Sequence, residues 1–399
     1  MRINIFANSD DNEKYYNNYN MSYLEEENLF LNPDGTRTRF PIGWNGHGRY
    51  APGSLKLFDN TNGGIEMDKA LYGEEDNGVF FNFASPLAAG KYTDITVKYI
   101  CRKKDYEFST GVKGSKYEGE EYFLFPNWKN GKGCGDAFWV GKYLASHADA
   151  VAGTTAQGSS AVPTSRKNVS PWTNIAHNTT NAQIKTNKGG IFHTMRNREW
   201  NNIILWDKEM NIKVDGNIYG SVNSSLTSVD EAGTNMSAYG ADSNYKTRTG
   251  MGPVTWNHNG KEGGIADLVG NVWEGVYGLQ LIHHAYYIFD EKNENFVSTG
   301  LNPPFSGASD SDYTYICNST DMEIECLPYG SGIDITGYTG TNHHHFWYDM
   351  VYNSNSEKGL YRGGSCVDGL NCGLFACALY DEPTHSNWSC GFRLVASLR

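Results

Sequence analysis

Cysteine is the residue of this chain with the most varied possible chemistry, and four of the eight cysteines lie close together toward the C-terminus. These four are Cys366, Cys372, Cys377 and Cys390. No two cysteines have the C-x-x-C spacing of a zinc ribbon or a thioredoxin-type redox site. A pair such as Cys366 and Cys372 could still bind a soft metal as thiolates.

Other metal-ligand or catalytic patterns are weak. His343, His344 and His345 are adjacent, so their side chains diverge, whereas the ligands of one metal ion must converge. We expect exposed loop histidines there. Asp310 and Asp312 offer oxygen ligands for calcium but lie in no EF-hand loop. The chain also has no G-x-S-x-G, Walker A, H-E-x-x-H or dinucleotide motif. The sequence therefore predicts no catalytic residue, no bound metal and no cofactor.

Two segments combine turn residues with charged residues. One is residues 263–274, and the other is residues 360–394, near the end of the chain. The sequence GNVWE, at residues 270–274, places Gly and Asn, which both tolerate positive φ, before a Trp and a Glu. We expect a tight turn that leads into a buried Trp. Asp267 and Glu274 have apolar neighbours, which favours structural pairing with Arg362 of the RGGS sequence or Arg393 of the GFRL sequence.

Short strands must position these segments. Aromatic and β-branched runs bounded by turn residues predict strands at 79–83, 95–100, 122–125 and 138–143. Residues 1–118 are expected to form a small β-rich module for attachment or assembly. A glycine-rich stretch at 111–119 is the expected linker, and residues 119–399 the second domain.

Two helices are expected. Ser170 and Pro171 resemble an N-cap and a first helical residue, followed by a stripe of Trp172, Ile175 and Ala176. The second helix would span Thr194–Lys208, with Thr194 as cap and Trp200, Ile203 and Ile204 buried. Residues 216–255 are rich in Ser, Gly and Asn and are expected to be loop. The fold class is therefore α+β and loop-rich.

Composition excludes several classes of protein. The chain has 399 residues, 14% of them aromatic, and a net charge of −12. The aromatic content disfavours intrinsic disorder. The acidic balance disfavours nucleic-acid binding, which needs a basic surface. No apolar run is long enough to span a membrane, so we expect no membrane insertion, and the first residues do not resemble a Sec-type signal peptide.

The GNVWE, RGGS and GFR sequences, in this order, resemble the formylglycine-generating-enzyme-like (sulfatase-modifying factor) branch of the C-type lectin fold. Residues 138–143 look like its opening strand and residues 195–200 like its R-x-x-E-W helix start. The resemblance covers residues 120–399 and implies a C-type lectin fold there.

The branch includes enzymes and binding proteins. The formylglycine-generating oxidase binds copper through two cysteines after RGGS. Here Cys366 and Cys372 are one residue further apart than in that pattern, and no arginine lies between Cys366 and Cys390. The iron-dependent sulfoxide synthases need three dispersed histidines, which the adjacent His343–His345 do not match. The GIADLVGNVWE stretch instead looks much like the variable proteins of diversity-generating retroelements.

In that family a ligand-binding surface is diversified at adenines of Asn codons, which yields NNY codons and so never Lys, Glu, Gln, Met or Trp. Residues 365–390 contain no Lys, Gln or Met, with Glu382 and Trp388 as the exceptions to the pattern. Glycines and buried residues such as Leu379, Pro383 and Phe392 would form the frame. Between them the ligand-binding residues would project outward, with Tyr380, His385 and Trp388 as anchors. The expected set is Val367, Asp368, Leu370, Asn371, Ala378, Tyr380, Asp381, His385, Asn387, Trp388 and Ser389.

The resemblance thus implies a non-enzymatic protein that binds a variable protein receptor or cell-surface ligand, on a phage virion or a bacterial cell surface. Several copies acting together, as a homo-oligomer, would strengthen such binding. The alternative is a formylglycine-generating-type copper oxidase that uses Cys366 and Cys372. A third hypothesis is a structural or carbohydrate-binding protein that never varies.

Overall fold

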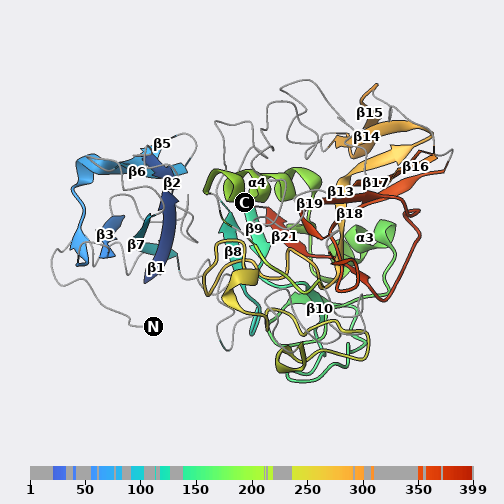
Figure 1. The fold of residues 1–399 in the computed structure, drawn as a ribbon, viewed down its shortest axis with the longest axis horizontal. Coiled ribbons are helices and arrows are strands. Elements are labelled where there is room, and N and C mark those ends of the chain that lie inside the picture. Colours follow the sequence, from blue (N-terminus) through green and yellow to red (C-terminus); the bar gives the residue numbers. More distant parts are fainter. Residues whose placement is uncertain are drawn as a thin grey trace.

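The computed structural model describes strands and short stretches of residues 21–125 and most of the chain from residue 138 onward (Figure 1). The described residues are 21–32, 39–41, 55–60, 63–75, 78–82, 91–102, 113, 117–125, 138–210, 212, 214–218, 236–290, 293–300, 307–309, 349–353, 356–369 and 372–397. They form several sheets and few helices, which confirms a mixed α and β fold.

The N-terminal strands form two small sheets, on the side of the N-terminus in Figure 1. The first has the order β1-β7-β3-β4 and the second β2-β6-β5. Their bounds are β1 Met21–Asn32, β2 Arg39–Pro41, β3 Lys56–Asp59, β4 Ile65–Glu66, β5 Tyr72–Glu75, β6 Gly78–Asn82 and β7 Lys91–Arg102, with the 3-10 helix η2 at Lys69–Leu71. The strand expected at 79–83 is confirmed, since β6 differs from it by one residue at each end. The strand expected at 95–100 is also confirmed and lies within the longer β7. The division at residue 118 stays a prediction.

A four-stranded sheet joins the beginning and end of the remaining chain. Its order is β12-β21-β9-β8. The bounds are β8 Tyr122–Phe125, β9 Phe138–Gly141, β12 Phe192–Thr194 and β21 Leu394–Ser397. β8 matches the expected strand at both ends, and β9 confirms the expected strand at 138–143 in its first four residues. Because β9 pairs with β21, this sheet is closed by residues far apart in sequence.

An eight-stranded sheet carries the C-terminal motifs. Its order is β15-β14-β13-β18-β19-β17-β16, and β20 pairs with β13. The bounds are β13 Trp273–Ile282, β14 Ala285–Asp290, β15 Asn295–Ser298, β16 Gly307–Ser309, β17 Asp349–Asn353, β18 Lys358–Gly363, β19 Gly373–Leu379 and β20 Cys390–Gly391. The GNVWE sequence leads into β13, and RGGS begins at the end of β18. A separate hairpin consists of β10 Ala145–His147 and β11 Pro163–Ser165.

The first helix starts later than the sequence predicts. α3 spans His177–Asn187, and the expected helix start at Ser170–Pro171 is wrong. Asn174 has a φ of +59°, which a right-handed helix cannot contain, and Trp172 donates its N–H to the Ala145 carbonyl of the neighbouring hairpin. The Trp172 side chain is nonetheless buried, so the apolar spacing marked a packed segment rather than a helix.

The second helix, α4, spans Asn197–Met210. Thr194 belongs to β12, so its expected role as cap is wrong. The Glu199 carboxylate instead accepts a hydrogen bond of 2.8 Å from the Arg196 N–H, which is one half of a capping box. Trp200, Ile203 and Ile204 are buried, as their spacing predicts. Both helices pack on β13.

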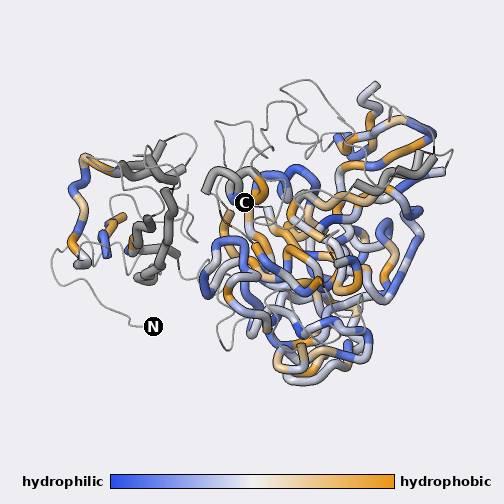
Figure 2. Tube along the Cα trace, viewed as in Figure 1, coloured by the Kyte–Doolittle hydropathy of each residue, from blue (hydrophilic) through white to orange (hydrophobic). Residues whose placement is uncertain are grey.

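The core lies between these strands and helices. One cluster of fully buried side chains includes Trp139, Ile184, Phe392 and Leu394. Figure 2 shows hydrophobic stretches of the trace through this part of the molecule. The described parts of 216–255 contain only short 3-10 helices, η3 at Met236–Tyr239 and η4 at Val254–Trp256. Within the described residues, no helix is long and apolar enough to cross a membrane.

Candidate binding face

The GNVWE turn forms hydrogen bonds to three other loops of the chain. Gly270 and Asn271 have φ values of +70° and +60°, which confirms the expected tight turn. The Asn271 side chain accepts the N–H of Thr247 at 2.8 Å, its N–H donates to the Asn217 carbonyl, and its carbonyl accepts the N–H of Cys366. One residue of the turn therefore holds three loops together. The sequence alone gave no sign of these partners.

The expected pairing of acid and arginine is confirmed for Glu274. The buried Arg393 donates two hydrogen bonds to this carboxylate, at 2.6 and 2.9 Å. It also donates to the carbonyls of Gly141 and Ala266, so its guanidinium connects three segments of the chain. Burial raises the pKa of Glu274, and the adjacent Arg393 opposes that shift.

Asp267 makes no salt bridge with either arginine. Its carboxylate accepts the N–H of Gly250 at 2.7 Å, while the second oxygen is buried without a hydrogen-bond partner. Burial raises the pKa of Asp267 to about 6. Arg362, the other arginine considered, donates to the Asn201 side chain at 2.7 Å. The expected role of Asp267 in such a pair is therefore wrong, because its backbone, at φ +61°, turns the carboxylate toward Gly250.

The four C-terminal thiols are buried and not disulfide-bonded. The Cys366 thiol donates to the Asn244 carbonyl at 3.3 Å, and the Cys372 thiol donates to the Ser365 carbonyl at 3.1 Å. Burial raises the pKa of Cys366 well above the usual thiol range, and that of Cys390 to about 12. Burial therefore favours the protonated thiol of Cys366 and Cys390 over the thiolate.

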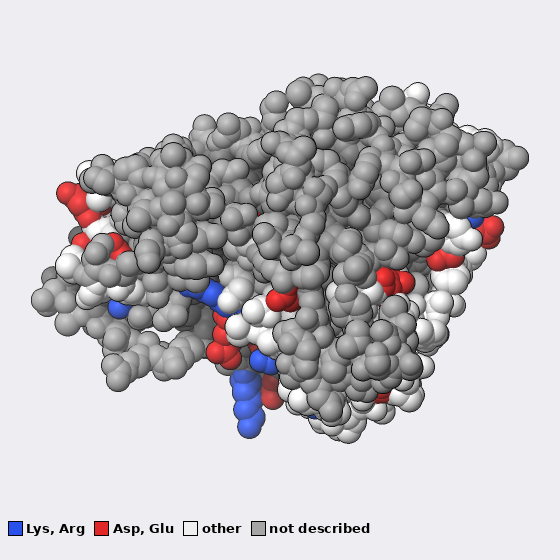
Figure 3. All heavy atoms as spheres, viewed as in Figure 1, with Lys and Arg blue, Asp and Glu red and all other residues white. Residues whose placement is uncertain are grey.

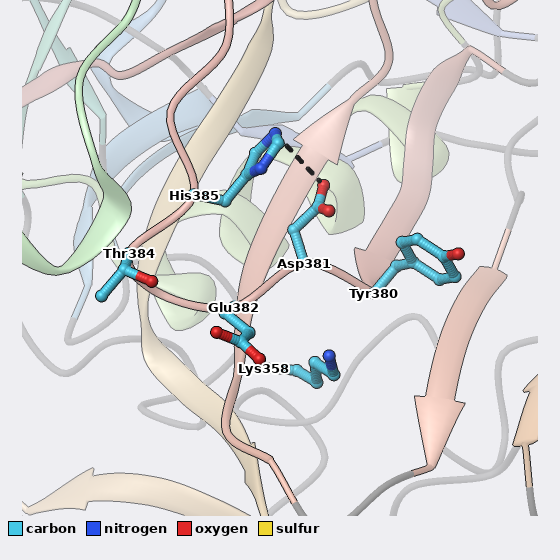
Figure 4. Close-up of a pocket in the computed structure, with 6 residues that line it drawn as sticks. All are labelled: Lys358, Tyr380, Asp381, Glu382, Thr384 and His385. Carbon is cyan, nitrogen blue, oxygen red and sulfur yellow. Dashed lines mark ion pairs between the residues drawn. The ribbon is translucent and has the colours of Figure 1, made fainter.

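Three of the expected ligand-binding residues, Tyr380, Asp381 and His385, line one hollow of about 310 Å³ (Figure 4). The other lining residues are Lys358, Glu382 and Thr384. Asp381 and His385 face each other, 3.7 Å apart, and Tyr380 is 41% exposed. The hollow therefore combines an aromatic ring, a hydroxyl group and charges of both signs, a composition suited to a polar ligand group.

The frame fixes the backbone around this hollow. The Asp381 carbonyl accepts the N–H of Gly359 in β18, and the Pro383 carbonyl accepts the N–H of Asn178 in the first turn of α3. The Tyr361 hydroxyl donates to the His385 carbonyl at 3.4 Å. Hydrogen bonds to β18 and α3 thus hold the backbone at 381–385, while all of its side chains except that of the buried Pro383 line the hollow.

A second group of expected residues surrounds Trp388. The Asn387 side chain accepts the N–H of Trp388, and the Lys246 ammonium lies 5.6 Å from the Trp388 ring centre. Val367 and Asp368 follow Cys366, whose thiol donates to the loop that also carries Lys246. Asp368 accepts hydrogen bonds from the N–H and the hydroxyl of Ser365.

A buried cluster links the two groups. It consists of Trp273, Tyr361, Ala376, Ala378 and Cys390. The Trp273 N–H donates to the carbonyl of Ser389, which follows Trp388, and the Tyr361 hydroxyl donates to the His385 carbonyl. We call Asp368, Trp388 and the residues that line the hollow, taken together, the candidate binding face.

The structure corrects two expectations of exposure. Ala378 is 5% exposed because it faces the buried cluster from β19. Ser389 is 8% exposed because it precedes β20, and its carbonyl accepts the N–H of Trp273. The expectation that these two project outward is therefore wrong. Leu370, Asn371 and His343–His345 lie outside the described residues.

Sequence reasoning missed three residues of the hollow. Glu382 and Thr384 lie between the predicted ligand-binding residues Asp381 and His385, so their position in the sequence could have indicated them. Lys358 comes from β18, and only the β18–β13 pairing and the fold of the C-terminal segment bring it there. The expected frame residues Leu379, Pro383 and Phe392 are buried, as predicted.

In Figure 3, acidic and basic side chains are scattered over the described part of the face shown, without a continuous basic patch there. No protein-family model matches the chain, and no curated protein is similar to it at a significant level. Two solved structures align with it over 87% of this chain and 72% of theirs. They are the P3c variant of the Major Tropism Determinant, with 12% identity and a TM-score of 0.31, and its U1 variant, with 11% identity and a TM-score of 0.29.

Proposed function

We propose that this chain is a non-enzymatic receptor-binding protein whose binding face is diversified by a retroelement. The observation that carries the proposal is the contrast within residues 365–390. Side chains from Tyr380 to His385 line an open hollow, while their backbone is hydrogen-bonded to β18 and α3. A surface of this kind can change its side chains without disturbing the core.

The sequence motifs act as the frame of that surface. Asn271 of GNVWE ties three loops together, and Arg393 of GFRL ties β21 to Glu274 and to the carbonyls of Gly141 and Ala266. The pairing of the opening strand β9 with the closing strand β21 supports a C-type lectin fold for residues 119–399. Its assignment to the formylglycine-generating-enzyme-like branch rests on the sequence motifs.

The partner we propose is a protein receptor or another ligand on a cell surface. Tyr380 and the half-buried Trp388 would supply rigid aromatic contacts, and Asp381 and His385 the polar ones. Residues 1–118 would attach the chain to a phage virion or a bacterial cell surface. A homo-oligomer would add avidity to weak single contacts.

Sequencing the DNA that flanks the gene tests this function. We expect an imperfect repeat of the codons for residues 360–394, which differs from the gene only at adenines, and a reverse transcriptase gene nearby. The differing codons should include those of Tyr380, Asp381 and His385, and should exclude those of Leu379 and Phe392. A flanking sequence without any such repeat would contradict diversification.

A further inference from the structure

A loop outside the C-terminal segment forms part of the same surface. It runs from Asp242 to Lys246, and the sequence indicated only loop there. The Cys366 thiol donates to its Asn244 carbonyl at 3.3 Å, and Lys246 contacts Trp388, 142 residues further along the chain. Ser243 and Asn244 are exposed.

This loop is held in one conformation by its own hydrogen bonds. The Asp242 side chain accepts the N–H groups of Asn244 and Lys246, and the Asp242 N–H donates to the Lys246 carbonyl. Tyr245 has a φ of +66°, and its carbonyl accepts a hydrogen bond from the Asn217 side chain at 2.8 Å. The loop is therefore a rigid support rather than a variable segment.

Lys246 is buried at the end of this loop. Its side chain is 3% exposed, and its ammonium lies 3.3 Å from the Asp242 carboxylate. The same ammonium donates to the Trp388 carbonyl at 3.1 Å and lies 5.6 Å from the centre of the Trp388 ring. Trp388 itself is half-buried, so it contacts this ammonium and is still partly accessible to a partner.

We propose that Lys246 is a positioning residue for the binding face and that Asp242 fixes its ammonium. Lys246 is too buried to contact a receptor, but it holds both the backbone and the ring of Trp388. An aromatic anchor that is fixed before binding loses less conformational entropy when a partner arrives. This inference rests on the proposed binding function.

Fluorescence quenching by acrylamide tests the inference without any partner. The signal of Trp388 is obtained as the difference between a protein and its Trp388→Phe counterpart, which separates it from the other tryptophans. The Lys246→Met substitution removes a cation–π contact and a hydrogen bond. The ratio of molecules whose Trp388 side chain has left this position to molecules that keep it there should therefore rise about five-fold. We therefore expect stronger quenching and a red-shifted emission of Trp388. Lys185→Met, at an exposed position of α3, is the matched control and should change neither.

Circular dichroism and the melting temperature show whether each variant is folded. Asp242→Asn can keep the hydrogen bonds to the Asn244 and Lys246 N–H groups but removes the counter-charge of the Lys246 ammonium, so it should raise quenching less than Lys246→Met does. It serves as the decisive variant if Lys246→Met does not fold. Unchanged Trp388 quenching in a folded Lys246→Met protein, or in Asp242→Asn in that case, would overturn the positioning role. Neither result alters the flanking-DNA test, so failure of the inference and failure of the proposed function are distinguishable.

Discussion

At the scale of single residues, one buried arginine connects several segments of the frame. Arg393 is fully buried, and its guanidinium bonds to Glu274 and two carbonyls. A planar group with five donors suits this position, whereas an ammonium cannot reproduce the paired geometry. The position therefore requires arginine in particular, and charge alone is insufficient.

The Arg393→Lys substitution should lower the free energy of unfolding by about 2 kcal/mol, since it keeps the charge and loses buried hydrogen bonds. Chemical denaturation measures this loss. Arg248→Lys is the control, because the Arg248 guanidinium bonds to Asn168 and Gly153 in a partly exposed position. An Arg393→Lys protein as stable as the Arg248→Lys protein would refute the structural role.

Asp267 should make stability depend on pH. Its pKa is raised to about 6 by burial, above the usual value of 3.8. The folded state therefore binds a proton more tightly than the unfolded state, and stability is lost as the pH rises from about 4 through about 6. Above that range the buried carboxylate costs on the order of 3 kcal/mol.

The Asp267→Asn substitution removes this cost. Asparagine tolerates the φ of +61° and still accepts the Gly250 N–H. We expect a higher melting temperature than that of the native chain at pH 7.5 and an equal one at pH 4. A variant less stable than the native chain at pH 7.5 would show that the charge of Asp267 is compensated.

At the scale of elements, tight turns decide how the strands present the face. Gly364 in RGGS has a φ of +86°, and a Cβ there would lie 2.5 Å from the Cys372 sulfur. The turn after β18 therefore admits only glycine. Such a turn sets the path of the chain toward β19, which bears the cluster beneath the face.

The Gly364→Ala substitution should lower the free energy of unfolding by about 2–3 kcal/mol, through backbone strain and overpacking. Gly190→Ala is the matched control, since a Cβ at Gly190 meets open space. The melting temperature of the Gly364→Ala protein should be lower than that of the Gly190→Ala protein. Equal melting temperatures would mean that the turn can rearrange.

The strands were more predictable from sequence than the helices were. Aromatic runs such as 122–125 are bounded by turn residues and became β8. The stripe at Trp172 and Ile175 predicted a helix, but Asn174 turns the backbone and the segment packs without helical bonds. The spacing of apolar residues therefore predicts which side chains are buried, whereas hydrogen bonds to distant segments determine whether the backbone is helical.

The candidate site was predictable in part for the same reason. Tyr380, Asp381 and His385 lie close together in sequence, within the segment that the resemblance to variable proteins indicated. Lys246 and Lys358 are brought to the candidate site only by long-range contacts, which no local pattern contains. The burial of Ala378 also depends on the register of β18 and β19.

At the scale of the whole molecule, the account predicts a rigid frame that tolerates change on one surface. The pairing of β9 with β21 joins segments far apart in sequence, so the frame does not depend on the side chains of the candidate face. Randomising exposed positions should then leave the fold intact, whereas randomising buried frame positions should destroy it.

The most direct test compares two libraries of the full chain, sorted for resistance to a protease. One library randomises Tyr380, Asp381, Thr384 and His385, and the other Leu379, Phe392 and Arg393. The account predicts that most members of the first library are as resistant as the native chain, and that few members of the second are. Equal loss of resistance in both libraries would contradict the claim that this surface varies independently of the frame.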